Sequence, residues 1–377
     1  MLRRNDNISS MLAGHIAAGD FPSAVYVVAE GGRVIFADAM GQAVNEPAPR
    51  QHAANLDTIY DLASLTKPLV TGLLCARRIE CGEFSLDDEV RLHLPEFDRP
   101  DKRTITLGQL LTHTSGLPAW LPLYIEAEKS ADVLRVIAER PLEAAPGARV
   151  RYSDLGFITL GRLLENLSGA PLAELARREI FDPLLLERTF FNPDASLRAE
   201  VAACELGNGY EREMCREMKM REWANWREQL IWGEVHDGNA HFLGGAAGHA
   251  GLFSTARETL RLAQQFVPGS TLVLRPATCA LFRTNMTEGM EEARSVAWQL
   301  AVTDGSTAGP SLPPDSFGHT GFTGTSCWID AARERIFILL TNRTHARSLP
   351  FVNINSVRRS FHRLAVAALE KEKDFQG

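Results

Sequence analysis

Short runs of hydrophobic positions, separated by polar or glycine-containing turns, lie near both ends of the chain and predict β-strands there. Apolar and β-branched residues occupy 24–29 and 34–36, and a glycine-containing turn separates these two runs. Two further apolar runs, 325–329 and 336–341, flank a polar turn in the C-terminal part of the chain. Runs of this length around a short turn are typical of β-hairpins. We therefore expect one hairpin near each end of the chain.

Elsewhere, apolar residues recur at the three-to-four-residue spacing of an amphipathic helix. Near the N-terminus this spacing joins Ile8, Leu12 and Ile16, and the segment lacks the unbroken apolar run of a signal peptide. Proline and glycine separate the helical stretches in the middle of the chain. The predicted helices cover 8–16, 69–79, 131–139, 155–168, 172–181 and 352–371.

Strands at both ends of the chain with helices between them predict an α+β fold. The simplest architecture is one antiparallel sheet that both chain ends form and that helices flank, with an inserted, mainly helical domain. We expect residues 1–75 and 256–377 to form the sheet domain and residues 76–255 to form the helical insertion.

The composition is that of an ordinary globular protein. The chain has 377 residues, of which 45% are hydrophobic and 23% are charged, and this excludes a disordered or collagen-like chain. The net charge of −7 argues against non-specific nucleic-acid binding, which depends on clustered lysine and arginine. The apolar stretches are shorter than the roughly 20 residues of a membrane-spanning helix. We therefore expect neither a nucleic-acid partner nor a membrane span.

The six cysteines include no C-x-x-C pair and no zinc-ligand spacing. In a chain of this size the usual interpretation is isolated, mostly buried thiols in a reducing compartment. The sequence therefore favours a cytoplasmic location and predicts no bound metal. Export of a protein whose leader is missing from this chain is the alternative.

Ser64 and Lys67 are the first candidates for chemistry. They lie three residues apart where the first hairpin gives way to a predicted helix, so their side chains share one helical face. Pro68 suits the first turn of a helix, which places Ser64 near the helix N-terminus. The positive end of the helix dipole would stabilise an anionic intermediate there. For this tetrapeptide alone, an N-cap serine followed by a surface lysine is the alternative interpretation.

Two further motifs follow along the chain. Tyr-Ser-Asp at 152–154 directly precedes a predicted helix, and His-Thr-Gly at 319–321 leads into the last hairpin. Between them lie His-Thr-Ser-Gly-Leu-Pro at 113–118 and Gly-His-Ala-Gly-Leu-Phe-Ser-Thr at 248–255. In this order the motifs resemble those of the serine β-lactamase and penicillin-binding protein superfamily. The resemblance is greatest to its class C-like branch of β-lactamases, D-alanyl-D-alanine peptidases and esterases, and it covers nearly the whole chain.

The resemblance implies a role for each matching position. Ser64 would be the acylated nucleophile, Lys67 its proton-transfer partner and Tyr152 the second general acid/base. The backbone N–H groups of Ser64 and Phe322 would form the oxyanion hole. Such a set is required because a serine hydroxyl is a poor nucleophile until a base removes its proton. No metal or other cofactor is implied.

The remaining motif positions are expected to contact the substrate: Asp154, His319, Thr320 and Gly321. Two of them depart from the family pattern, because Asp154 replaces the usual asparagine and His319 replaces the frequent lysine. An ionised Asp154 would raise the pKa of Lys67, and the lysine cation would favour a phenolate at Tyr152. We therefore predict that Tyr152 is the dominant base.

His319 also changes the expected substrate. Histidine is mostly neutral at pH 7, so the motif loses the cation that would bind a substrate carboxylate. A hydrogen bond to a charged group contributes about 1.5–3 kcal/mol, against about 0.5–1.5 kcal/mol for a neutral one. This favours esters or uncharged amides. Glycine at 321 suits a strand edge where backbone and substrate approach closely.

Several other groups are open to two interpretations. The residues His236, Asp237, Asn239 and His241 suggest a metal site, but a hydrogen-bonded loop near the pocket is the simpler interpretation. Residues 205–229 are expected to form a solvated helix with one apolar face, with a substrate-side lid as the alternative. His113 is expected to serve packing. Three tryptophans are candidates for the cleft or for the core: Trp120, Trp232 and Trp298.

The sequence thus predicts a serine hydrolase that cleaves an ester or amide bond through an acyl-enzyme on Ser64. Its substrate would be a small-molecule ester, a β-lactam or a peptide of the D-Ala-D-Ala type, with esterase or peptidase-like activity favoured. A true class C-like β-lactamase is the first alternative. A catalytically silent binding protein on the same fold is the second.

Overall fold

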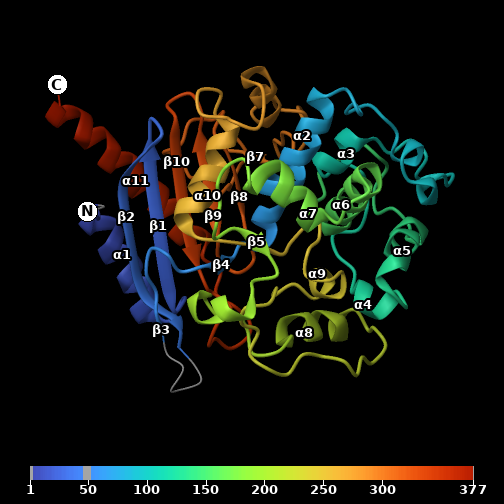
Figure 1. Ribbon diagram of the computed structural model, residues 1–377, viewed down its shortest axis with the longest axis horizontal. Coiled ribbons are helices and arrows are strands. Elements are labelled where there is room, and N and C mark those ends of the chain that lie inside the picture. The colour runs from blue at the N-terminus through green and yellow to red at the C-terminus, as the bar shows by residue number, and fades with distance from the viewer. Residues whose placement is uncertain (1–2, 46–51, 377) are drawn as a thin grey trace.

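The computed structural model describes residues 3–45 and 52–376 and contains an antiparallel sheet covered by helices on both faces (Figure 1). The seven strands have the order β3-β2-β1-β10-β9-β8-β7. Their bounds are β1 Ser23–Glu30, β2 Arg33–Val44, β3 His52–Ala53, β7 Gln299–Leu300, β8 Phe317–Thr320, β9 Ser326–Asp330 and β10 Arg335–Thr341. Both predicted hairpins are confirmed, as β1–β2 and β9–β10.

The two chain ends meet in the middle of this sheet. Strand β1 pairs with β10 in a register that joins Ala24 to Thr341 and Glu30 to Arg335. The sheet is therefore built from both ends of the chain, and the predicted α+β class is confirmed.

Side chains of β1 alternate between the two faces of the sheet, as expected for a strand buried on both sides. Tyr26 and Val28 pack with helices α1 (Asp6–Ala18) and α11 (Asn355–Gln376). On the opposite face, Val25 and Val27 belong to the large core that also includes helix α10, Ala256–Ala263.

The segments between the two ends are mainly helical (Figure 1). The α-helices are α2 Leu73–Glu80, α3 Leu107–Leu111, α4 Leu123–Glu126, α5 Val133–Glu139, α6 Asp154–Ser168, α7 Leu172–Ala176, α8 Gly209–Glu217 and α9 Gly238–Phe242. A small sheet joins β4 (Tyr60–Asp61), β6 (Leu252–Ser254) and β5 (Phe190–Phe191). One continuous core joins most of these helices to the large sheet, whereas α8 packs against α4 in a separate cluster. The domain boundaries at 75/76 and 255/256 stay a prediction.

The predicted helix over 205–229 is wrong in its length. Helix α8 ends at Glu217, and residues 218–229 continue as irregular backbone, with Lys219 at a left-handed φ of 55°. Trp223 and Trp226 leave the helical path because they pack around Tyr124, at ring-centroid distances of 6.1 and 5.7 Å. These two tryptophans thus lie in a loop and pack against helix α4.

All six cysteines are free thiols, and only Cys81 is exposed. Within residues 3–45 and 52–376, no helix has the length and apolar character needed to cross a membrane.

Candidate active site

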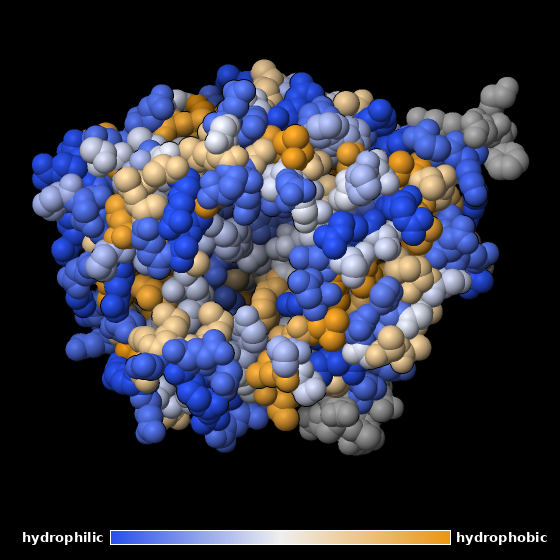
Figure 2. All heavy atoms as spheres, turned by 180° about the vertical axis from the view of Figure 1, so that it is seen from behind, coloured by the Kyte–Doolittle hydropathy of each residue, from blue (hydrophilic) through white to orange (hydrophobic). Residues whose placement is uncertain are grey.

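A cavity of about 680 Å³ lies between the edge of the large sheet and the helical part of the chain. Figure 2 shows that one face of the molecule is hollowed near its centre, with polar and apolar side chains mixed around the hollow. The cavity brings together Ser64, Tyr152, Asp154 and residues 319–322. Three distant segments of sequence therefore face one space, as the motif order predicts.

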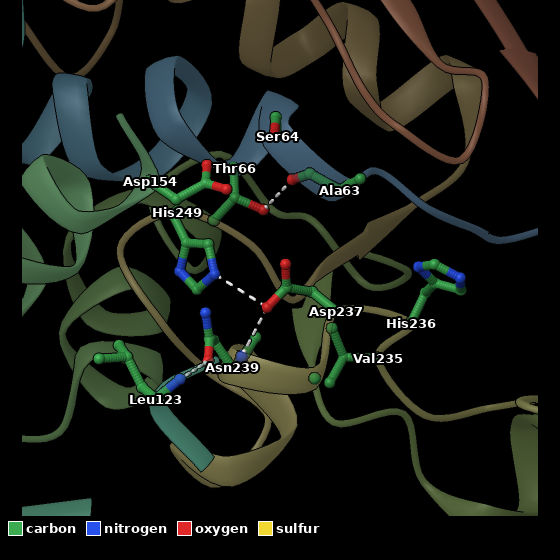
Figure 3. Close-up of polar contacts among 12 residues, drawn as sticks. Ala63, Ser64, Thr66, Leu123, Asp154, Val235, His236, Asp237, Asn239 and His249 are labelled. Carbon is green, nitrogen blue, oxygen red and sulfur yellow. Dashed lines mark hydrogen bonds and ion pairs between the residues drawn. The ribbon is translucent and has the colours of Figure 1, made fainter. Parts of the chain in front are cut away.

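Ser64 lies in the short 3₁₀ turn η1, Ala63–Leu65, directly before the helical turns that begin at Lys67. Ala63 has a φ of 47°, a left-handed conformation that is uncommon for a residue with a side chain. Asp61 Oδ1 accepts the backbone N–H of Ala63 at 2.8 Å. The Thr66 hydroxyl donates to the Ala63 carbonyl at 2.7 Å, as Figure 3 shows. These bonds hold the strained turn that presents Ser64.

Lys67 is fully buried, so it is not a surface lysine. Its Nζ atom donates to Ser64 Oγ at 2.9 Å and to the His249 carbonyl at 3.0 Å. Asp154 Oδ1 lies 2.7 Å from the same nitrogen. The ammonium group therefore contacts the candidate nucleophile, a backbone carbonyl and a carboxylate at once.

The ionisation of Lys67 and Tyr152 depends on opposing effects. Burial lowers the pKa of Lys67, but the charges of Asp154 and Tyr152 outweigh it and the pKa is raised. Burial raises the pKa of Tyr152 and outweighs the lowering effect of Lys67. The expected ammonium at Lys67 therefore agrees with the structure. The expected effect of this cation on Tyr152 is also present, but burial outweighs it and raises the pKa of the phenol.

Tyr152 is positioned by the turn that begins helix α6. Ser153 caps this helix by accepting the Gly156 N–H at 3.3 Å, and its own N–H donates to His113 Nδ1 at 3.0 Å. The His113 ring lies 4.5 Å from the Tyr152 ring, and Lys67 Nζ lies 5.0 Å from the same ring. His113 therefore contacts the tyrosine as a packing residue, as expected.

His319 lies on β8 with its ring 5.9 Å from that of Tyr152. Its Nδ1 atom is 2.9 Å from the Thr320 carbonyl, a contact in which the nitrogen carries the proton. Burial, followed by the charges of Lys67 and Arg294, lowers the pKa of His319 well below its ordinary value. The imidazole is therefore neutral, as the sequence predicts.

Gly321 directly follows β8, where the chain meets the turn that carries Ser64. A Cβ atom there would lie 2.1 Å from Thr325 Oγ1 and 2.4 Å from the Leu62 carbonyl oxygen. Thr325 Oγ1 also donates to this carbonyl at 2.9 Å. Gly321 thus allows the backbone after β8 to approach the Leu62 carbonyl closely.

The backbone N–H groups of Ser64 and Phe322 are the expected oxyanion hole. Both residues line the cavity. Within the described part of the chain, neither N–H has a hydrogen-bond acceptor, whereas the N–H of neighbouring Leu65 donates to the Leu62 carbonyl. Two free donors beside Ser64 Oγ are what an anionic tetrahedral intermediate requires.

The loop that suggested a metal site is a hydrogen-bonded network. His236 Nε2 pairs with Glu205 Oε2 at 2.9 Å. His249 Nε2 pairs with Asp237 Oδ1 at 2.9 Å, as Figure 3 shows. Asn239 accepts the backbone N–H at the start of helix α4. Among the described residues, no group of three or more histidine, cysteine, aspartate or glutamate side chains is arranged to hold a metal ion.

The structure also places residues in the cavity that the motifs did not indicate. The charged ones among them are Glu211, Glu292, Arg294, Asp304, Arg343 and Arg358. They lie in segments without a recognisable spacing, so the sequence carries no local signal for them. Of the three tryptophans considered, Trp120 lines the cavity, whereas Trp232 and Trp298 are buried in the core. Helix α8 also contributes to the lining, which agrees with the substrate-side alternative for 205–229.

Comparisons with known proteins agree with this geometry. The sequence profile of the Beta-lactamase family matches residues 8–356. A putative D-alanyl-D-alanine carboxypeptidase of Escherichia coli K12 is 29% identical over 357 residues, which cover 86% of this chain and 79% of the relative. An N-acetylmuramyl-L-alanine amidase of Bacillus subtilis 168 is 31% identical over 374 residues, which cover 90% and 80% of the two chains.

Solved structures share the fold. EstCE1, described as a hydrolase with promiscuous acyltransferase activity, has a TM-score of 0.72 at 23% identity and covers 96% of this chain and 98% of its own. A class C beta lactamase from Rhodobacter sphaeroides has a TM-score of 0.72 at 19% identity and covers 97% and 100%. At these identities the likeness establishes the architecture alone.

Proposed function

The chain belongs to the beta-lactamase family of serine hydrolases, and we propose that it acts through an acyl-enzyme formed on Ser64. The observation that carries this proposal is the contact of 2.9 Å between Lys67 Nζ and Ser64 Oγ, with the lysine fully buried. The nearby Tyr152 and the free N–H groups of Ser64 and Phe322 supply the other groups that acyl transfer needs.

In the proposed reaction, Ser64 Oγ forms a bond to the substrate carbonyl carbon and its proton moves to the Lys67–Tyr152 pair. The bond from that carbon to the leaving oxygen or nitrogen then breaks, and the same proton passes to the leaving group. Water next adds to the acyl carbon, the ester bond to Ser64 breaks, and the hydroxyl regains a proton. The products are a carboxylic acid and an alcohol or amine.

Tyr152 is the dominant base in this proposal. Lys67 is held in its ammonium form by Asp154, and this ammonium donates to Ser64 Oγ, so it cannot accept the proton at the same time. Because both pKa values are raised, the pair must lose one proton before it can accept that of Ser64. We therefore expect kcat/KM to rise with pH through an apparent pKa that belongs to the pair.

The proposed substrates are esters and amides, with esterase or peptidase-like hydrolysis before β-lactam hydrolysis. The names of the relatives include a carboxypeptidase and an amidase, and the neutral His319 weakens the usual binding of a β-lactam carboxylate. The cavity still contains positive charge, however, because three arginines line it.

Active-site labelling tests the acyl-enzyme. We expect a fluorophosphonate to label the wild type and the matched variant Ser85→Ala, which removes an exposed serine outside the cavity, but not Ser64→Ala. Turnover of p-nitrophenyl esters, D-Ala-D-Ala peptides and nitrocefin then ranks the substrate classes. Nitrocefin hydrolysis as fast as ester hydrolysis would favour the class C-like β-lactamase. Absence of labelling and turnover would favour a silent binding protein and overturn the proposal.

A further inference from the structure

Two sequence motifs that the proposed mechanism does not use lie beside Lys67. One is the His-Asp pair at 236–237, and the other is the segment Gly-Gly-Ala-Ala-Gly-His-Ala-Gly at 244–251. Lys67 Nζ donates to the backbone carbonyl of His249 in the second motif, at a distance of 3.0 Å. This motif therefore supplies a carbonyl that the ammonium contacts in addition to Ser64.

The ammonium of Lys67 has three N–H donors and three neighbours. The neighbours are Ser64 Oγ at 2.9 Å, Asp154 Oδ1 at 2.7 Å and the His249 carbonyl at 3.0 Å. Three acceptors fix the direction of all three N–H bonds, whereas with one acceptor fewer the ammonium is free to turn. The position of the His249 carbonyl therefore affects how Lys67 faces the nucleophile.

The segment that carries this carbonyl has a single polar side chain. All other residues of 244–251 are glycine or alanine, so only His249 can anchor the segment through a side-chain hydrogen bond. Its imidazole is buried, and Nε2 donates to Asp237 Oδ1 at 2.9 Å (Figure 3). Among the described residues, Nδ1 has no hydrogen-bond partner. On the backbone, Thr71 donates its hydroxyl to the Gly248 carbonyl at 2.7 Å. Asp237 is therefore the residue that holds the imidazole.

Asp237 is itself fixed relative to the turn that carries Ser64. The preceding residue, His236, donates its N–H to Asp61 Oδ2 at 2.8 Å, and Asp61 Oδ1 accepts the Ala63 N–H at 2.8 Å. The Asp61 side chain is buried, so one carboxylate joins the two segments inside the protein. The loop at 236–237 therefore braces both the turn of the nucleophile and the carbonyl beside the ammonium.

We propose that Asp237 is a positioning residue for acyl transfer, which acts through His249 to hold the carbonyl that orients Lys67 toward Ser64. This inference rests on the proposed acyl-enzyme function. In the part of the chain that the structure describes, Asp237 makes no hydrogen bond to Ser64 or Lys67, so its effect on them passes through His249. A reacting group is held in its productive geometry by such supporting hydrogen bonds.

Inactivation by a fluorophosphonate measures the attack of Ser64 alone. Ser64 Oγ forms a bond to phosphorus, the bond from phosphorus to fluorine breaks, and the serine proton passes to the Lys67–Tyr152 pair. We expect Asp237→Ala to lower the maximal rate constant of inactivation about 10- to 100-fold, because a small displacement of Lys67 misaligns the proton transfer. The half-saturating inhibitor concentration should change less than about threefold, since the oxyanion hole stays in place.

Two further variants separate this role from helix capping and from charge. Asp237 Oδ1 also accepts the Ala240 N–H at the start of α9, at 2.7 Å. His249→Phe keeps a ring but lacks Nε2, so it should lower the rate about as much as Asp237→Ala, and the double variant should lower it no further. Asp237→Asn should recover most of the rate, since its amide oxygen can accept both N–H groups. Asp194→Ala, which removes an exposed helix-cap aspartate outside the cavity, is the control and should leave the rate unchanged.

The outcomes separate this inference from the function on which it rests. A wild-type rate in His249→Phe, or an additive fall in the double variant, would overturn the role of Asp237 through His249. An equal fall in Asp237→Ala and Asp237→Asn would overturn it too, because charge would then explain the effect. If Asp237→Ala folds poorly in a thermal melt, His249→Phe and Asp237→Asn still decide the question. A wild type that is labelled no more than Ser64→Ala would overturn both proposals.

Discussion

Two ion pairs lie at the same cavity, and they differ in how many nitrogen donors of the cation already have a protein partner. Lys67 Nζ contacts Ser64, His249 and Asp154 and is fully buried. Arg294 pairs with a Glu292 side chain that is 34% exposed, and one of its nitrogens has no acceptor among the described residues. A saturated cation can act only on the groups it already contacts, whereas an unsaturated one can bind a ligand. The first cation is therefore committed to the groups around Ser64, whereas the second keeps a donor beside the cavity.

Removal of Lys67 should have the largest effect on activity and stability, because this cation contacts the most groups. We expect Lys67→Met to lower kcat/KM at least about 10³-fold, because Ser64 Oγ loses its contact with Nζ and the Tyr152 base loses the cation that lowers its pKa. It should also destabilise the fold by about 3–5 kcal/mol, because Asp154 loses its buried counter-charge. Urea unfolding and ester kinetics measure the two effects. The double variant Lys67→Met/Asp154→Asn should recover stability but not activity, and recovered activity would contradict the assignment of Lys67.

Glu211 is another carboxylate of the cavity. It differs from Asp154 and Glu292 because neutral groups, and not a cation, donate to it. Tyr124 donates its hydroxyl to Oε2 at 2.7 Å and Gly238 donates its N–H to Oε1 at 2.7 Å. Burial, followed by the charge of Asp237, raises the pKa of Glu211 from 4.5 to about 7. A carboxyl with a raised pKa in the folded state contributes stability that is complete below about pH 4.5 and is lost as pH rises through 7.

Glu211→Gln should therefore flatten the pH dependence of stability between about pH 4.5 and 7, by roughly 1–3 kcal/mol. Glutamine can accept from Gly238 and donate to the Tyr124 oxygen, so it retains both contacts. Unfolding in urea at several pH values measures the change. Glu213→Gln, on the exposed side of the same helix, is the matched control. Parallel pH profiles for Glu211→Gln and the wild type would contradict the raised pKa.

Gly321 tests the contact between the sheet edge and the turn that carries Ser64. Gly321→Ala would place a methyl group 2.4 Å from the Leu62 carbonyl oxygen, so the strand or the turn must move. We expect a loss of about 1–3 kcal/mol in stability, as for other overpacked sites, together with a lower kcat. Gly14→Ala, on an open helix face, is the control and should leave both unchanged or stabilise the helix slightly. Wild-type kcat for Gly321→Ala would show that the turn tolerates displacement.

Asp154→Asn is expected to have the smallest effect, a shift of the pH–rate profile. The Asp154 charge raises the pKa of both Lys67 and Tyr152. Its removal should lower both pKa values and move the acidic limb of kcat/KM to lower pH. Kinetics between pH 5 and 10 with a neutral ester measure the shift, with Asp132→Asn, outside the cavity, as control. Identical profiles for Asp154→Asn and the wild type would remove the electrostatic account of the base.

Regular elements could be predicted because their signals are short in range. The hairpins follow from short apolar runs on either side of a turn, and helix α6 follows from a period of three to four residues. The segment 205–229 failed because Trp223 and Trp226 look like one face of a helix in sequence, whereas their packing around Tyr124 stabilises a loop. Periodicity cannot tell a helix from a loop whose apolar residues are buried by a distant element.

The active site also has features that the sequence predicts and features that only the tertiary structure sets. Ser64 and Lys67 are three residues apart, so helical geometry alone brings their side chains together, and the motifs around Tyr152 and His319 identify their partners. The resting ionisation of Tyr152 was not predictable, because burial opposes the nearby cation and burial is a property of the assembled cavity. Arg294 lies 142 positions from Tyr152 in the chain, and only the pairing of β7 with β8 sets it over the phenol ring. Local spacing therefore specifies which groups can react, while the depth of the cavity and the charges on its walls arise from contacts between segments that are remote in sequence.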